Sequence, residues 1–213
     1  MAFTALDHVT IATDSEEVAG VCYAFGADVE MTSDRHNSGT ERVAEVATRA
    51  VYADVSIIVN VQGDEPFIVE EHVSAAVQMV NTGNDIGTVA APIRSLAVWR
   101  DPAVVKIARA TNGRALYFSR APIPFNRDAD PDFNHTEGTD YLRHIGVYAY
   151  NRAALLKWVS LPESALEGIE KLEQLRPLEA GMSIGVAIVN AAEGGVDTAA
   201  DLERANRLLS QST

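Results

Sequence analysis

The sequence contains a single cysteine, Cys22, among its 213 residues. One cysteine cannot form an internal disulfide, so we expect a protein of the reducing cytoplasm. No apolar run approaches the roughly 20 residues that a membrane-spanning helix needs. The N-terminal residues also lack the basic region and the small-residue cleavage site of a secretion signal. We therefore predict a cytoplasmic protein that has no membrane partner.

Positive charge is scarce as well. Lysine and arginine number 17 against 30 aspartates and glutamates, which gives a formal net charge of −13. Such a field repels the phosphate backbone, so we predict no nucleic acid partner. A small anionic substrate is compatible with this charge, because local arginines or a bound cation can override the net field.

Two further signatures are missing. The chain has neither the G-x-G-x-x-G nor the G-x-x-x-x-G-K-[ST] pattern that grips phosphate groups in many nucleotide-binding proteins. Its five histidines show no close spacing of metal ligands, so we predict no zinc site. Any phosphate-binding site in this protein must therefore use residues other than these glycine-rich motifs.

The sequence does contain an alternation of strands and helices. Short β-branched runs predict strands at 9–12, 56–61, 86–91, 144–151 and 184–189, with a strand-like run at 115–120. Helical spacing predicts helices opening at Ser15 and covering 40–50, 69–80, 153–158, 167–179 and 198–209. Such alternation indicates an α/β fold with a mostly parallel sheet covered on both faces. We predict a single domain over 1–213, with residues 92–150 as an excursion.

The first candidate site lies in "IIVNVQGDEP" (57–66), where a buried strand stops and two carboxylates, Asp64 and Glu65, follow at once. In open α/β sheets, ligands bind outside the carboxyl ends of strands. A carboxylate there is well placed to hold Mg²⁺. The alternative is a turn in which one of these residues caps the next helix.

The second candidate is Asp197 in "GGVDT" (194–198), where paired glycines let the backbone approach a ligand closely. The alternative is that Asp197 or Thr198 only caps the last helix. Asp64 and Asp197 together could clamp one cation, so each strengthens the interpretation of the other.

Two more segments carry polar side chains in suggestive patterns. "RHNSGTER" (35–42) could present backbone N–H groups to a ligand, or form a capping box that begins at Ser38 or Thr40. In "YLRHIGVYAYN" (141–151), His144, Tyr148 and Tyr150 fall on one face of a strand. They could line a polar pocket, or form an ordinary half-buried face rich in aromatic residues.

Taken together, these motifs resemble a known family. "IATDSEEVA", "HNSGTER", "VNVQGDEP", "ALYFSRAPIP", "YLRHIGVYAY", "LEQLR" and "GVDTAADLERA" occur in the order seen in 3-deoxy-manno-octulosonate cytidylyltransferases, also called CMP-Kdo synthetases. The resemblance covers nearly the whole chain. It implies a three-layer α/β/α nucleotidyltransferase fold, Rossmann-like, with a small β-rich excursion that forms a homodimer. It also implies transfer of CMP from CTP to 3-deoxy-manno-octulosonate (Kdo), with release of pyrophosphate, for lipopolysaccharide biosynthesis.

The resemblance also assigns roles to individual residues. Asp64 and Asp197 correspond to the catalytic aspartates that bind Mg²⁺. The positions that correspond to the sugar pocket are Arg120, Arg127, His144, Tyr148, Glu173 and Gln174. The positions near the nucleotide are Ser38, Gly39, Thr40, Arg42 and Gln62.

The chain departs from the family pattern at its beginning. The family's "ARxxSxRLPxKxL" loop, which grips the triphosphate, is absent together with roughly 35 residues, about one strand–loop–helix unit. We therefore expect a sheet without one inner strand, and little or no cytidylyltransferase activity from the 213-residue chain. Two alternatives are a cytidylyltransferase for another acidic sugar, such as a nonulosonate or an 8-amino Kdo analogue, and a non-catalytic remnant that binds sugar acids.

Overall fold

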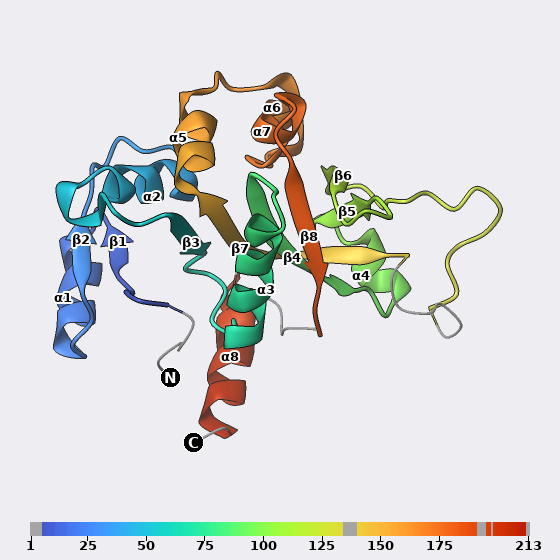
Figure 1. Cartoon of the computed structure of the whole chain (residues 1–213). Coiled ribbons are helices and arrows are strands. Elements are labelled where there is room, and N and C mark those ends of the chain that lie inside the picture. The colour runs from blue at the N-terminus through green and yellow to red at the C-terminus, as the bar shows by residue number, and fades with distance from the viewer. Residues whose placement is uncertain (1–5, 134–139, 191–194, 197, 212–213) are drawn as a thin grey trace.

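The computed structural model describes residues 6–133, 140–190, 195–196 and 198–211 (Figure 1). The strands are β1 (Ile11–Thr13), β2 (Val29–Met31), β3 (Ile57–Val61), β4 (Ile86–Pro92), β5 (Lys106–Arg109), β6 (Ala115–Ser119), β7 (Leu142–Asn151) and β8 (Ile184–Ile188). The helices are α1 (Glu16–Ala24), α2 (Gly39–Ala47), α3 (Glu70–Asn81), α4 (Leu96–Arg100), α5 (Arg152–Ser160), α6 (Ala165–Glu170), α7 (Leu175–Glu179) and α8 (Ala199–Gln211), with a 3₁₀ turn, η1, at Ala50–Tyr52. No helix among the described residues is long and apolar enough to span a membrane.

The elements predicted from the sequence are present, with one division. The helix expected over 167–179 is two helices, α6 and α7. Lys171 ends α6 because it adopts a left-handed backbone conformation, with φ at 55°. The strands β2 and β5 and the helix α4 were not predicted, because each is too short to show a period.

The larger sheet has six strands, with the order β6-β5-β7-β4-β8 and β3 paired to β7. It is mixed rather than mostly parallel: β4 and β8 run parallel, whereas β7 is antiparallel to β3, β4 and β5. A parallel pair needs a long crossover, usually through a helix. Strand β7 instead enters the sheet from the excursion that holds the β5–β6 hairpin, so it runs against its neighbours.

Helices cover both faces of this sheet, as expected. Strand β4 shows the alternation: Ile86 packs in one buried cluster with Trp158 of α5, and Val89 packs in another with Ala76 of α3. Figure 1 shows α3 in front of β4 and β7. The two clusters form separate cores on opposite faces, which is the three-layer arrangement of an α/β fold.

Strands β1 and β2 form a parallel sheet of their own. Within the described residues, neither strand pairs with the six-stranded sheet. With α1 they lie on the opposite side of the molecule from β5, β6 and α4 (Figure 1). Contacts to α2 join this small unit to the rest of the chain.

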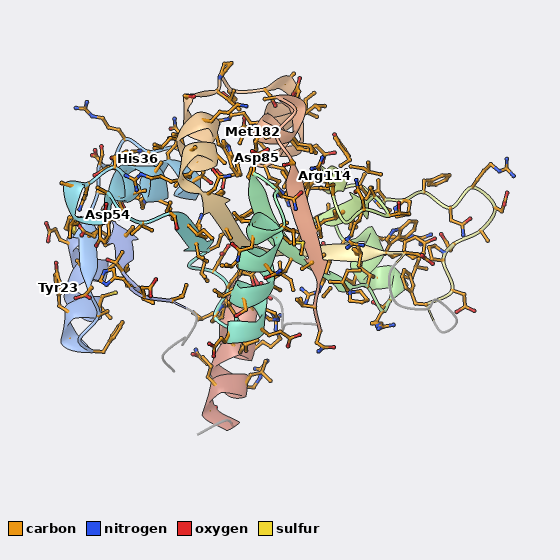
Figure 2. The ribbon with its side chains drawn as sticks, viewed as in Figure 1. Tyr23, His36, Asp54, Asp85, Arg114 and Met182 are labelled. Atoms are coloured by element: carbon orange, nitrogen blue, oxygen red, sulfur yellow. The ribbon has the colours of Figure 1, made fainter. Side chains whose placement is uncertain are left out.

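A charged cluster on α2 strengthens that junction. The Glu45 carboxylate accepts hydrogen bonds from the Ser33 backbone N–H at 2.9 Å, from Arg49 at 2.9 Å, and lies 2.5 Å from His36 Nε2. Arg49 also pairs with Glu30 of β2. His36 lies beside α2 in Figure 2. The Ser33 N–H, His36 and Arg49 together lower the pKa of Glu45 to about 2.

Replacing Glu45 by glutamine should lower the free energy of unfolding by about 1 to 2 kcal/mol at pH 7, a range reduced for solvent screening. The folded pKa lies below the ordinary 4.5, so this stabilisation is complete above pH 4.5 and disappears as pH falls towards 2. Urea unfolding at pH 7 and pH 3 should show the gap between the two proteins shrinking by about half or more. Asp54→Asn, an exposed change outside the cluster, is the control. A gap of equal size at both pH values would contradict the linkage.

Candidate functional site

A cleft of about 1600 Å³ opens beside the carboxyl end of β3 and along β7. It brings together residues from distant parts of the chain. The predicted site residues that line it are Ser38, Gln62, Asp64, Arg120, His144, Tyr148, Glu173 and Gln174. The structure therefore places most of the predicted nucleotide, metal and sugar residues around one space.

Three predicted nucleotide residues do not line this cleft. Gly39 and Thr40 form the first turn of α2 behind its wall. Arg42 points to the β1–β2 unit, where its Nη2 lies 3.1 Å from an oxygen of Asp14. The assignment of these three residues to the nucleotide stays a prediction.

Arg127, predicted to bind the sugar, lies away from the cleft. Its exposed guanidinium donates to Asp128 at 2.9 Å. Asp197 lies outside the described residues. The next residue, Thr198, caps α8 through reciprocal hydrogen bonds with Asp201, so the capping alternative applies to Thr198.

The end of β3 is held in place by backbone contacts. The Glu65 N–H donates to the Gln62 carbonyl at 3.1 Å, and the Val196 N–H donates to the Asp64 carbonyl at 2.8 Å. Helix α3 begins only at Glu70, with Val69 at its N-cap, so Asp64 and Glu65 do not cap it. The capping alternative for Asp64 is therefore wrong.

The Asp64 carboxylate is exposed and makes no hydrogen bond to the described residues. No group of three or more metal-binding side chains occurs among those residues. A cation at Asp64 would accordingly need ligand atoms from elsewhere, and Mg²⁺ commonly takes such atoms from water and substrate phosphates. Because Val196 contacts the Asp64 backbone, the chain beside position 197 reaches this turn.

His144 lines the cleft from β7. Its Nε2 lies 3.0 Å from Thr88 Oγ1, and its ring packs edge-on against Phe118. Burial, and secondarily the charge of Arg143, lower the pKa of His144 to about 3. The ring is therefore neutral at physiological pH and serves as a hydrogen-bonding group.

Tyr148 lies beside His144 on the same strand face, as predicted, with ring centroids 5.1 Å apart. Its ring packs edge-on against Trp158 and stacks on Tyr150. Burial raises the pKa of Tyr148 well above its ordinary value, so its hydroxyl stays protonated. The pocket interpretation and the buried-face interpretation of this strand both hold.

Arg120 is held by the main chain. Its Nε donates to the Glu170 carbonyl and its Nη1 to the Pro102 carbonyl, each at 3.0 Å, and its own N–H donates to the Glu170 carboxylate at 2.9 Å. Beneath it, the fully buried Lys106 donates to the Arg120 carbonyl at 2.5 Å. A fixed guanidinium that retains free N–H groups is suited to a carboxylate.

Glu173 lines the cleft and is hydrogen-bonded to α2. Its Oε1 accepts a hydrogen bond from Thr40 Oγ1 at 2.8 Å, which ties the loop before α7 to the first turn of α2. Burial raises the pKa of Glu173. Ser38 is the N-cap of α2 and accepts from the Glu41 N–H at 3.3 Å, so the predicted cap is confirmed at Ser38. The Glu41 carboxylate accepts from the Asn37 N–H at 2.9 Å, so the second bond of the predicted capping box goes to Asn37 instead.

Sequence reasoning missed Gly146. Its N–H donates to the Glu65 carboxylate at 3.0 Å, and its carbonyl accepts from the Gln62 N–H at 3.2 Å. A Cβ at this position would lie 2.3 Å from Gln62 Oε1. An isolated glycine inside a strand pattern is a signal of such close approach, and "RHIGVY" contains one.

Comparison with known proteins agrees with this geometry. The family described as Cytidylyltransferase matches residues 2–184. The chain belongs to the cytidylyltransferase family. A 3-deoxy-manno-octulosonate cytidylyltransferase of Gemmatimonas aurantiaca is 50% identical over 201 residues, covering 94% of this chain and 77% of that protein. The protein of the same name from Pseudomonas syringae is 46% identical over 209 residues, covering 95% and 82%.

Solved structures agree with this family assignment. One described as CMP:2-keto-3-deoxy-manno-octonic acid synthetase complexed with CTP superposes with a TM-score of 0.87. It is 38% identical and covers 99% of this chain and 83% of the other. A putative glucose-1-phosphate thymidylyltransferase from Bacillus anthracis, 14% identical with a TM-score of 0.57, shares the fold alone.

Proposed function

We propose that this protein transfers CMP from CTP to Kdo, giving CMP-Kdo and pyrophosphate for lipopolysaccharide biosynthesis. The observation that carries the proposal is that Asp64, Arg120 and His144 converge on one cleft from distant segments. The relative solved with CTP, at 38% identity over 99% of this chain, supports the nucleotide. The names of the curated relatives support the sugar.

Arg120 supports an acidic sugar in particular. Its guanidinium is held by two backbone carbonyls and faces a cleft in an otherwise acidic protein. The Kdo carboxylate can accept paired N–H bonds from such a group. His144 and Tyr148 also line the cleft. Both are neutral hydrogen-bonding groups, which suit sugar hydroxyls.

Asp64 fits a Mg²⁺ ion, with Asp197 proposed as the second carboxylate. When bound, Mg²⁺ supplies positive charge to the polyphosphate. The residues of this chain bind the sugar and the nucleotide and orient them. Arg120 holds the sugar carboxylate, His144 and Tyr148 hold its hydroxyls, and Ser38 and Gln62 line the nucleotide side. A hydroxyl of Kdo then loses its proton to solvent and forms a bond to the α-phosphorus of CTP, while the bond to pyrophosphate breaks. Such transfer depends chiefly on positioning and charge neutralisation.

A cytoplasmic homodimer is part of the proposal. Leu116 and Phe125, in the excursion over 92–150, are 63% and 79% exposed. Exposed apolar side chains of this size favour contact with a second copy of the chain. A nucleoside triphosphate substrate and a lone cysteine favour the cytoplasm.

The test measures pyrophosphate release and CMP-sugar formation with CTP and Mg²⁺. The sugars compared are Kdo, its 8-amino analogue and a nonulosonate. Calorimetry measures the binding of CTP and of Kdo alongside, so that binding is known independently of turnover. The highest kcat/KM should be obtained with Kdo. A higher value for another sugar would indicate a cytidylyltransferase for that sugar. Binding without any product would indicate a non-catalytic protein that binds sugar acids. The absence of both binding and turnover would overturn the proposal.

A further inference from the structure

Thr88 is a fully buried polar residue in the middle of β4. Its Oγ1 lies 2.7 Å from the Val147 carbonyl oxygen and 3.0 Å from His144 Nε2. Both partners belong to β7, where the β4–β7 register shifts from the Thr88–Tyr148 pair to the Val89–Ile145 pair. Val147 lies within this shift, and His144 pairs beyond it with Ala90. One hydroxyl group therefore connects the sheet interior to a side chain of the cleft.

The number of hydrogen atoms decides the direction of these bonds. A threonine hydroxyl has one hydrogen, and a carbonyl oxygen can only accept. The hydrogen of Thr88 must therefore go to Val147, and Thr88 Oγ1 must accept from His144. The proton of the neutral imidazole accordingly lies on Nε2.

The other ring nitrogen is then a bare acceptor. With its pKa lowered by burial, the ring carries only one N–H at neutral pH. Nδ1 makes no hydrogen bond to any of the described residues, while the His144 side chain lines the cleft beside Tyr148. A group that binds there must donate a hydrogen, so a hydroxyl fits, whereas a carboxylate or keto oxygen does not.

We propose that Thr88 is a positioning residue that holds His144 as the Nε2–H tautomer, so that Nδ1 accepts a hydrogen bond from a hydroxyl group of the sugar substrate. The assignment of the tautomer stands on the geometry of Thr88 alone. Its ligand half rests on the proposed function. It explains how one histidine can select hydroxyl-bearing ligands in a cleft that also binds anions.

The test uses the full chain and two substitutions at one position. Thr88→Val removes the acceptor at nearly constant volume, and Thr88→Ser keeps it. The matched control is Thr82→Val, because Thr82 also donates to a carbonyl, that of Met79, and accepts from Asn84, far from the sugar wall. Nitrogen-detected NMR of the imidazole, assigned with His144→Asn, reports the tautomer. Calorimetry reports the affinities for Kdo and for CTP.

The expected results are a protonated Nε2 in wild type and in Thr88→Ser, and a loss of that single tautomer in Thr88→Val. In Thr88→Val, Kdo binding should weaken by about tenfold and CTP binding should be unchanged. In the control Thr82→Val, the thermal midpoint should be unchanged. If Thr88→Val does not fold, the spectra of wild type and Thr88→Ser still show which nitrogen of His144 is protonated. A wild-type ring protonated on Nδ1, or wild-type tautomer and Kdo affinity in folded Thr88→Val, would overturn the inference.

Failure of the proposed function would look different. If wild type bound no Kdo, the ligand half of the inference would fall together with that function. The NMR signal of His144 would still separate this result from a wrong tautomer, because it needs no ligand.

Discussion

Replacing Asp64 by asparagine is expected to lower kcat for CMP-Kdo formation by about a thousandfold. The change removes one negative charge from the cleft and keeps the size of the side chain. Charge stabilisation of a polyphosphate by a held cation is worth several kcal/mol, and each ~1.4 kcal/mol is a factor of ten in rate. Asparagine keeps an oxygen ligand but loses the charge that Mg²⁺ prefers.

The fold should tolerate this change. The Asp64 contact that braces the turn is its backbone carbonyl, which accepts from Val196 at 2.8 Å in either variant. The side chain is exposed and unbonded among the described residues. The thermal midpoint should therefore stay close to that of wild type, as is usual for surface changes away from buried contacts.

Steady-state kinetics over a range of Mg²⁺ concentrations measures the effect. Asp128→Asn is the matched control, since its exposed carboxylate lies outside the cleft and should leave kcat unchanged. Retention of more than about a tenth of wild-type kcat by Asp64→Asn at saturating Mg²⁺ would remove Asp64 from the metal site.

The position of Asp64 could be predicted because its signal is local. A β-branched run that ends in Gly63 and is followed by Pro66 marks a strand end, and strand ends are where α/β sheets bind ligands. His144 and Tyr148 could be placed on one face for the same reason, since the period of a strand is two residues. Both side chains line the cleft, and their role in binding the sugar stays a prediction.

The arginines show which placements a sequence pattern does not predict. Arg42, Arg120 and Arg127 are alike in charge and reach, but only Arg120 lines the cleft. Asp14 holds Arg42 on another surface, and Asp128 pairs with Arg127 in the exposed excursion. The direction of a long side chain depends on partners that fold beside it, and no local pattern encodes them.

The direction of β7 and the role of Thr88 could not be predicted from the sequence, for one shared reason. The mixed sheet arises because β7 returns through the excursion, which periodicity cannot show. Thr88 contacts His144 across 56 residues of sequence. Both depend on pairing between distant strands, whereas the sequence signals used here span only a few residues.

Replacing Gly146 by alanine is expected to lower kcat/KM by about a hundredfold while the protein stays folded. The new methyl group would lie 2.3 Å from Gln62 Oε1 and 3.1 Å from Glu65 Cγ, so both side chains must move. Gln62 and Glu65 flank the Asp64 turn, and a displacement of about 1 Å at a reacting site can cost a factor of about 100.

A second glycine of the same sheet supplies the contrast. Alanine at Gly87 would place its Cβ 2.0 Å from the backbone oxygen of Ala76, so α3 itself would have to move off the sheet. We expect a loss of about 3 kcal/mol or more in the free energy of unfolding, typical of severe overpacking. The clash at Gly146 involves a side-chain end beside an open cleft, which can yield without moving a helix.

Thermal unfolding and steady-state kinetics on the two variants separate these effects. Gly146→Ala should keep a thermal midpoint close to that of wild type and lose activity, and Gly87→Ala should lose stability first. If Gly146→Ala kept kcat/KM within about twofold, the packing of Gln62 over Gly146 would be irrelevant to transfer. If it unfolded like Gly87→Ala, the glycine would be needed for the sheet, and the close approach at the cleft would be a consequence of folding rather than a device for positioning Asp64.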